Sequence, residues 1–261
     1  MKNSSSFKRT FCDGWDLLCD QSLPKICYPA EKSGKRSDYI FNPLYTLPLW
    51  AALAAVIAGL AGRFLAAFLP AKGAALIFAI IMFAACEMRT TFRGMALSVS
   101  FLEKLLYGKG FTASILHRQD DLRNINGLPA LLLAAAFAGC KFFALYWSAK
   151  SGNYGVAGAA WLIALAAEGF LAGEPAAENM PSYCVQAKSE YIVGIAGFFL
   201  LFNLINQPLA TLIAAGVSAA LVILMMNLLL KNTGRITSND MTMTGYWLET
   251  AVFLIFAVMI G

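Results

Sequence analysis

The chain has 261 residues, of which 59% are hydrophobic and only 13% are charged. Soluble globular domains are usually about 25% charged, so this composition argues against a soluble enzyme. The formal net charge of +5 comes without an interleaved pattern of aromatic and basic residues, and we therefore expect no nucleic acid among the partners.

The first 42 residues predict a cytoplasmic tail. Lys8 and Arg9 do not begin a signal peptide, because Asp13 and Asp16 follow before any apolar core is formed. Residues 43–261 predict one membrane domain, since the sequence shows neither an internal repeat nor a second soluble unit.

Seven apolar runs predict an all-α, polytopic bundle of about seven transmembrane helices. A bilayer core needs roughly 20 apolar residues per helix, and its backbone groups are satisfied only inside helices or closed barrels. Two of the runs are short and must borrow flanking residues. The runs are 44–69, 73–86, 128–148, 154–172, 191–205, 208–230 and 246–261.

The placement of basic residues predicts the orientation. With the N-terminus in the cytoplasm, 16 of the 20 lysines and arginines fall on the cytoplasmic side, as the positive-inside rule requires. We therefore expect a multi-pass protein of the cell membrane, in bacteria the inner membrane, whose active face is cytoplasmic. This topology is compatible with homo-oligomers of the chain and with hetero-oligomers that include another membrane protein.

Two polar loops, 87–127 and 231–244, face the cytoplasm in this topology. The first contains an amphipathic stretch, 100–107, that predicts a helix lying on the membrane surface. Arg118 suits a phosphate and Asp120 suits Mg²⁺, although a solvated face with internal ion pairs explains both. In the second loop, Ser238, Asn239 or Asp240 is expected to cap the last helix.

Three glutamates lie inside predicted spans, where charged groups are costly and mark functional sites. Counting 1.5 Å per residue places Glu87, Glu168 and Glu249 about 21, 22 and 24 Å from the outer face. The shared depth predicts a cavity, open to the cytoplasm, that binds a metal ion, a phosphate or both. The alternative is that each glutamate reaches the inner interface or pairs locally.

Two basic residues also lie inside predicted spans, Arg63 and Lys141. The same count places both near the outer face, where long basic side chains reach the interface. An ion pair between Lys141 and Glu168 is not expected, because their depths differ by about 12 Å.

The order of these features resembles the cobalamin synthase family, the adenosylcobinamide-GDP ribazoletransferases. The likeness is diffuse and nearly full length. It rests on Trp15-Asp16-Leu17-Leu18, Leu23-Pro24, Leu47-Pro48-Leu49, the segments 91–97, 117–128 and 234–240, and Val252-Phe253-Leu254.

The resemblance implies a transferase that joins α-ribazole, or its phosphate, to adenosylcobinamide-GDP with release of GMP, using Mg²⁺. It implies phosphate binding by Arg118 and Gly94 and metal binding by Asp240; Asp120 is added as a metal ligand on proximity. Catalytic residues stay unassigned.

The chain departs from the family at its acidic signature. Where the family carries three aspartates, this sequence has Arg93, Leu97 and Ser100, and only Gly94 is kept. Two alternatives to an active transferase therefore stay open. One is a catalytically degenerate paralogue that acts as a membrane binding or scaffold protein. The other is a small transporter that uses the three intramembrane glutamates.

Overall fold

The computed structural model describes residues 46–89, 93–106, 128–172 and 207–260, and all of the regular structure in that part is helical. The predicted all-α fold is therefore confirmed for the described residues. The tail 1–42, the apolar run 191–205, Arg118 and Asp120 lie outside them. The helices are α2 (Leu47–Phe68), α3 (Ala71–Arg89), α4 (Arg93–Leu106), α6 (Leu128–Lys150), α7 (Val156–Ala172), α10 (Pro208–Thr233) and α11 (Ser238–Ile260).

Six of the seven predicted apolar runs coincide with one of these helices. Four helical stretches are long and apolar enough to cross a membrane: Ala71–Arg89, Leu131–Lys150, Pro208–Lys231 and Asn239–Met259. Large apolar side chains are also exposed along the helices, notably Leu60, Phe64 and Phe68 of α2 and Leu212 and Leu224 of α10. Such a surface is unfavourable in water and suits contact with lipid.

Helix ends follow from local sequence. Pro48 and Pro208 lie in the first turns of α2 and α10, where the missing N–H is not needed. Gly234 ends α10 with φ of 69°, and its N–H donates to the Leu230 carbonyl at 3.0 Å. This left-handed conformation favours glycine, so the chain turns there and enters α11 four residues later.

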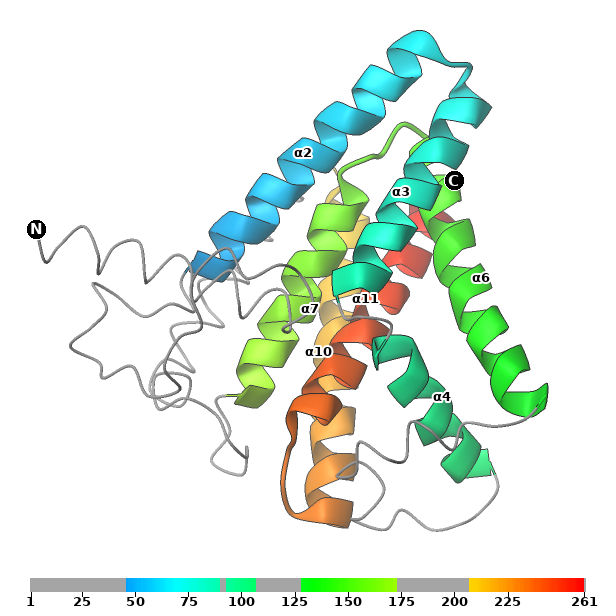
Figure 1. Cartoon of the computed structure of the whole chain (residues 1–261). Coiled ribbons are helices and arrows are strands. Elements are labelled where there is room, and N and C mark those ends of the chain that lie inside the picture. The colour runs from blue at the N-terminus through cyan, green and yellow to red at the C-terminus, as the bar shows by residue number, and fades with distance from the viewer. Residues whose placement is uncertain (1–45, 90–92, 107–127, 173–206, 261) are drawn as a thin grey trace, which may run out of the picture.

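Helix α11 is the centre of the bundle. It packs against α4, α6, α7 and α10, and Figure 1 shows it running among them with α2 at the edge of the bundle. Its apolar span is 72% buried, against 22% to 39% for the other three spanning stretches. Side chains on α11 therefore meet groups from most of the fold, whereas α2 contributes mainly an outer surface.

The predicted loop 231–244 is mostly helix, because α10 continues to Thr233 and α11 already begins at Ser238. The polar residues at the start of α11 are compatible with a helix because their hydroxyl groups form hydrogen bonds with the backbone. The Thr244 hydroxyl donates to the Asp240 carbonyl at 2.8 Å. Half of the expected loop, residues 238–244, is thus the start of the central helix, and residues 239–244 are buried.

The amphipathic stretch predicted at 100–107 is part of a longer helix, α4, which starts at Arg93. The apolar side chains of α4 that the structure describes do not lie open to a membrane surface. Leu97 and Phe101 are buried with Met225 and Met243, and the ring of Phe101 meets Trp247 edge-on at 5.6 Å. For these described side chains, the partner of the apolar face is the protein itself.

Candidate functional site

Five charged side chains from four helices form one continuous set of ion pairs, here called the charge cluster. Lys141 Nζ lies 3.0 Å from Glu87 Oε1 and 2.8 Å from Glu249 Oε1. Arg89 Nη2 lies 3.3 Å from Glu249 Oε2 and 3.3 Å from Glu168 Oε1. The order is therefore Glu168–Arg89–Glu249–Lys141–Glu87, with Glu249 of the central helix between both cations.

Burial makes these pairs energetically important. The side chains of Glu87, Lys141 and Glu249 are 0% exposed, that of Arg89 is 4% exposed and that of Glu168 is 20% exposed. An isolated charge in such surroundings costs several kcal/mol, which a well-placed partner offsets. Each charge in the cluster has such a partner, and only Glu168 reaches solvent to a notable extent.

The structure thus brings together the three glutamates that were expected to share one depth. They do not converge on one another, because Arg89 and Lys141 lie between them. In the described residues no group of three or more histidine, cysteine, aspartate or glutamate side chains is arranged to hold a metal ion. The expected cavity for a metal or phosphate is therefore filled by the chain's own cations.

The prediction that Lys141 reaches the outer interface is wrong. The depth count placed Glu249 near the start of its helix, whereas α11 begins at Ser238, so Glu249 lies about 16 Å along it. Lys141 lies about 20 Å along α6, and the two residues meet in the interior. Its partners are Glu87 and Glu249. Arg63, by contrast, is exposed on α2.

Aromatic groups and a thiol lie beside the charge cluster. Lys141 Nζ lies 4.3 Å from the ring centroid of Tyr246, a cation–π geometry. The Trp161 indole N–H donates to the sulfur of Cys86 at 3.2 Å, next to Glu87 in the chain. Sequence reasoning did not single out Tyr246. The available signal was its position three residues before Glu249, which places both on one face of α11.

Gly94 has a packing role. A Cβ atom at this position would lie 2.7 to 2.9 Å from the Cδ2, Cβ and Cγ atoms of Tyr246. The ring of Tyr246 therefore occupies the space that the resemblance reserved for a phosphate. Gly245 shows a similar close approach, because its Cβ would lie 2.1 Å from Glu168 Oε1. Small residues let α4 and α7 approach the central helix.

Asp240 lies in the first turn of the central helix. Its Oδ2 accepts from the Thr237 N–H and the Thr237 hydroxyl, each at 2.8 Å, and its own N–H donates to the Thr237 hydroxyl at 3.3 Å. This reciprocal pattern is a capping box, with Thr237 as the N-cap. The N-cap is therefore Thr237, and not Ser238, Asn239 or Asp240 as the sequence predicted; Asp240 takes part in the cap from the third position of the helix. The side chain of Arg93 donates to Asn239 beside it.

The acids of the described part do not fit the Mg²⁺ that the resemblance implies. Asp240 is 1% exposed and its Oδ2 already accepts two hydrogen bonds. Glu87, Glu168 and Glu249 are paired with arginine and lysine side chains, which repel a divalent cation. We therefore derive no chemical step through Mg²⁺ at these residues.

Replacing Asp240 by alanine is expected to lower the free energy of unfolding by about 1 kcal/mol, the usual cost of a lost helix cap. Asp240→Glu should retain most of the stability, because glutamate serves at the same position of a capping box. Unfolding in mixed detergent micelles, with and without Mg²⁺, checks this. A Mg²⁺-dependent stabilisation that disappears in Asp240→Ala would instead make Asp240 a metal ligand.

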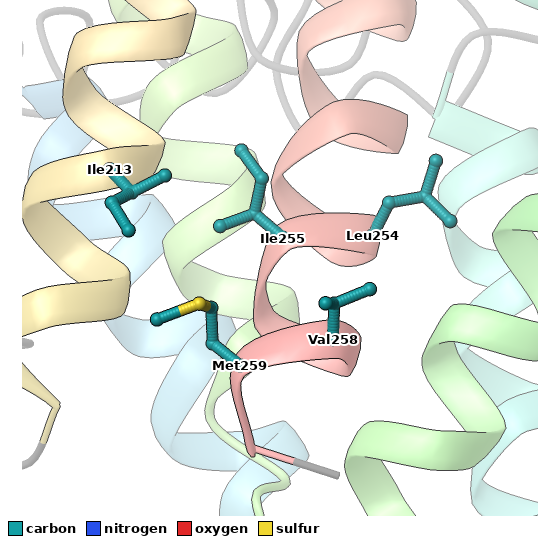
Figure 2. A pocket seen from close by; sticks show the side chains of 5 residues that line it. All are labelled: Ile213, Leu254, Ile255, Val258 and Met259. Carbon is teal, nitrogen blue, oxygen red and sulfur yellow. The ribbon is translucent and has the colours of Figure 1, made fainter.

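An apolar groove lies between α10 and α11, away from the charge cluster. Figure 2 shows its lining, and its volume is about 300 Å³. The lining side chains are Ile213, Leu254, Ile255, Val258 and Met259. Because none of these side chains has a polar atom that could orient a phosphate, a sugar or a metal, the groove is not a candidate for the transferase site.

Comparison of the chain with models of protein families, with curated proteins and with solved structures finds no significant match to any of them.

Proposed function

We propose that the chain is a polytopic membrane protein related to the adenosylcobinamide-GDP ribazoletransferases, which binds their nucleotide-linked corrinoid substrate but does not transfer it. The observation that carries the proposal is that these acidic side chains already bind other groups of the protein. The three glutamates are ion-paired, and Asp240 caps α11. Transfer at a diphosphate needs neutralisation of its charge, usually by Mg²⁺ held on free carboxylates.

Two described positions of the segment where the family carries its acidic signature support the same proposal. Gly94 is covered by Tyr246, and the neighbouring Arg93 bonds to Asn239 where the family has an aspartate. These contacts join α4 to α11. In this proposal the chain shares the helical bundle of the family, while the positions that would carry out the transfer serve packing.

Binding of the ligand is assigned to the cytoplasmic loops. Seven spans with the N-terminus in the cytoplasm place both loops on one side, as the 16 basic residues counted on that side support. Arg118, in the segment that resembles the family, supplies a planar group suited to a phosphate. The α10–α11 turn with exposed Arg235 lies on the same side.

The test is a parallel measurement of turnover and binding on the purified protein in detergent. Adenosylcobinamide-GDP, α-ribazole and Mg²⁺ are supplied, and we expect no release of GMP. Equilibrium dialysis, read by the visible absorbance of the corrinoid, should show binding that is weakened at least tenfold in Arg118→Ala. The matched control is Arg63→Ala, which removes an exposed arginine of α2 that the predicted topology places near the outer face. This variant should bind normally.

Two outcomes would overturn the proposal in different directions. Release of GMP at a steady rate would establish an active transferase whose metal ligands lie elsewhere in the chain. Absence of both turnover and binding, in protein shown to be folded by its thermal unfolding, would remove the corrinoid from its function.

A further inference from the structure

Helix α10 has one face inside the bundle and one face outside it. It packs mainly against α11, and Ala210, Ala214 and Met225 on its inner face are buried. The opposite face is exposed along most of the helix. A row of exposed residues on that face recurs at alternating spacings of four and three, and we call this row the α10 seam. Its members are Leu209, Ile213, Gly216, Ala220, Ile223 and Asn227.

The spacing of the α10 seam is the one found where two helices pack side by side. Residues that recur every 3.5 positions on average are the a and d positions of a heptad, and they stay on the contact side of a helix that coils around a partner. Most helix pairs in membranes cross in this left-handed sense. Lipid chains cover an apolar row equally well, so the spacing alone does not identify what lies against the seam.

Asn227 distinguishes a protein partner from lipid. It is the polar member of the seam, it is exposed, and within the described helices its amide makes no hydrogen bond. The earlier polar side chains of α10, Thr211 and Ser218, are instead buried in the bundle. Asn227 lies one helical turn, about 6 Å, before Lys231, where the apolar stretch ends. Lipid chains offer an amide no hydrogen-bond partner, so a polar group from another helix is favoured.

We propose that two copies of the chain pair through α10, with the two seams in contact and the two Asn227 amides hydrogen-bonded to each other. An amide has an acceptor oxygen and two N–H donors, so it is complementary to a second copy of itself. Copies inserted in the same orientation have parallel α10 helices, and a two-fold axis between them places like residues opposite each other.

The position of Asn227 within the seam supports a pair. When Ile213 and Ala220 are assigned to a positions, Asn227 occupies the next a position of the heptad. In parallel coiled coils a single asparagine at an a position specifies the register and the number of helices. The partner is therefore identified as a second copy, which presents the same amide at the same depth.

Small residues in the middle of the seam allow the two helices to approach. Gly216 and Ala220 lie one turn apart, and a Cβ atom at Gly216 would meet no atom of the protein within 4 Å. The backbone of α10 is open to a partner helix there, as is usual for helix contacts in membranes. The charge cluster lies on other helices, and the pairing requires neither the corrinoid nor catalysis, so it stands independently of the proposed function.

Energy transfer between copies of the full chain in lipid vesicles tests the pairing. Donor-labelled and acceptor-labelled protein is mixed, and the transfer is measured as the protein is diluted with lipid. The wild type should exceed the transfer of randomly distributed monomers. Asn227→Leu should raise the dissociation constant about tenfold, the effect of losing one hydrogen-bonded amide contact between membrane helices. Asn227→Gln keeps an amide and should retain most of the affinity.

Disulfide trapping identifies the face that pairs. In a chain whose native cysteines are replaced by alanine, Ala220→Cys should form a disulfide-linked dimer on oxidation with copper phenanthroline, because the two copies of this residue meet at the axis. The matched control is Ala136→Cys, which changes an exposed alanine of α6 and should remain monomeric.

Three results would overturn the proposal. Transfer equal to that of random monomers at every dilution would leave the seam to lipid or to another protein. An Asn227→Leu chain that pairs as tightly as the wild type would mean that the amide reaches the lipid headgroups. Trapping of Ala136→Cys in preference to Ala220→Cys would place the interface on α6. Both α10 positions are exposed, so the variants should fold, as thermal unfolding checks. If Asn227→Leu does not fold, the trapping result alone decides.

Discussion

Lys141→Met should lower the free energy of unfolding by about 3–5 kcal/mol, the usual cost of removing one partner of a buried ion pair. Methionine keeps much of the length and packing of the lysine chain but leaves Glu87 and Glu249 without the nitrogen that lies 3.0 and 2.8 Å from them. Unfolding in mixed detergent micelles, followed by tryptophan fluorescence, measures the loss.

The matched control is Lys150→Met on the same helix. Lys150 is exposed, and its nitrogen lies 4.4 Å from the ring centroid of Trp147, a contact worth about 0.5–1 kcal/mol at an exposed site. Adding Glu249→Gln to Lys141→Met should recover part of the stability, because one fewer buried charge is then unmatched. A Lys141→Met protein as stable as the wild type would contradict the cluster and would suit a lysine at the outer interface.

The depth estimate from sequence placed the three glutamates close together but did not predict their basic partners. Depth along a helix follows from residue counting, so carboxylates at similar counts were expected in one layer, and the structure has them in one cluster. The count depends on where each helix starts. Because polar residues before Tyr246 were taken as a loop, Glu249 was placed too close to the helix start and Lys141 was separated from it.

A lysine inside an apolar run was itself a signal of a buried partner. Charged residues in spans usually face the bundle interior and pair with one another. Lys141 was instead treated by its depth alone, as a residue that extends to the interface. Which face of α6 carries it depends on how α3 and α11 pack, and the weak amphipathicity of α6 leaves this undetermined in the sequence.

The positions taken from the family resemblance show a second limit of prediction from the sequence. Motif spacing located Gly94 and Asp240 and gave reasons for their residue types, namely close approach and negative charge at a helix start. Both physical reasons hold in the structure, but the close neighbour of Gly94 is Tyr246 and the charge of Asp240 is used at Thr237. A residue type reports the local requirement and not whether a ligand or the protein meets it.

Gly94→Ala distinguishes whether the glycine is needed for packing within the protein or for the close approach of a ligand. If Gly94 serves packing, the new methyl group meets the ring and Cβ of Tyr246 at 2.7 to 2.9 Å, and overpacking of this kind costs about 1–3 kcal/mol. The loss should appear even though alanine is favoured over glycine inside a helix by about 1 kcal/mol. The measurement is unfolding of the purified variant without any ligand.

Two glycines without close neighbours serve as controls. A Cβ at Gly139 of α6 or Gly216 of α10 would meet no atom within 4 Å, so both alanine variants should be as stable as the wild type or slightly more stable. Tyr246→Ala removes the ring that meets Gly94, and the double variant should therefore lose less stability than the sum of the two single changes. A Gly94→Ala protein that unfolds like the wild type but no longer binds adenosylcobinamide-GDP would reverse the assignment. The glycine would then be kept for a phosphate, and Tyr246 would have to move aside when the ligand binds.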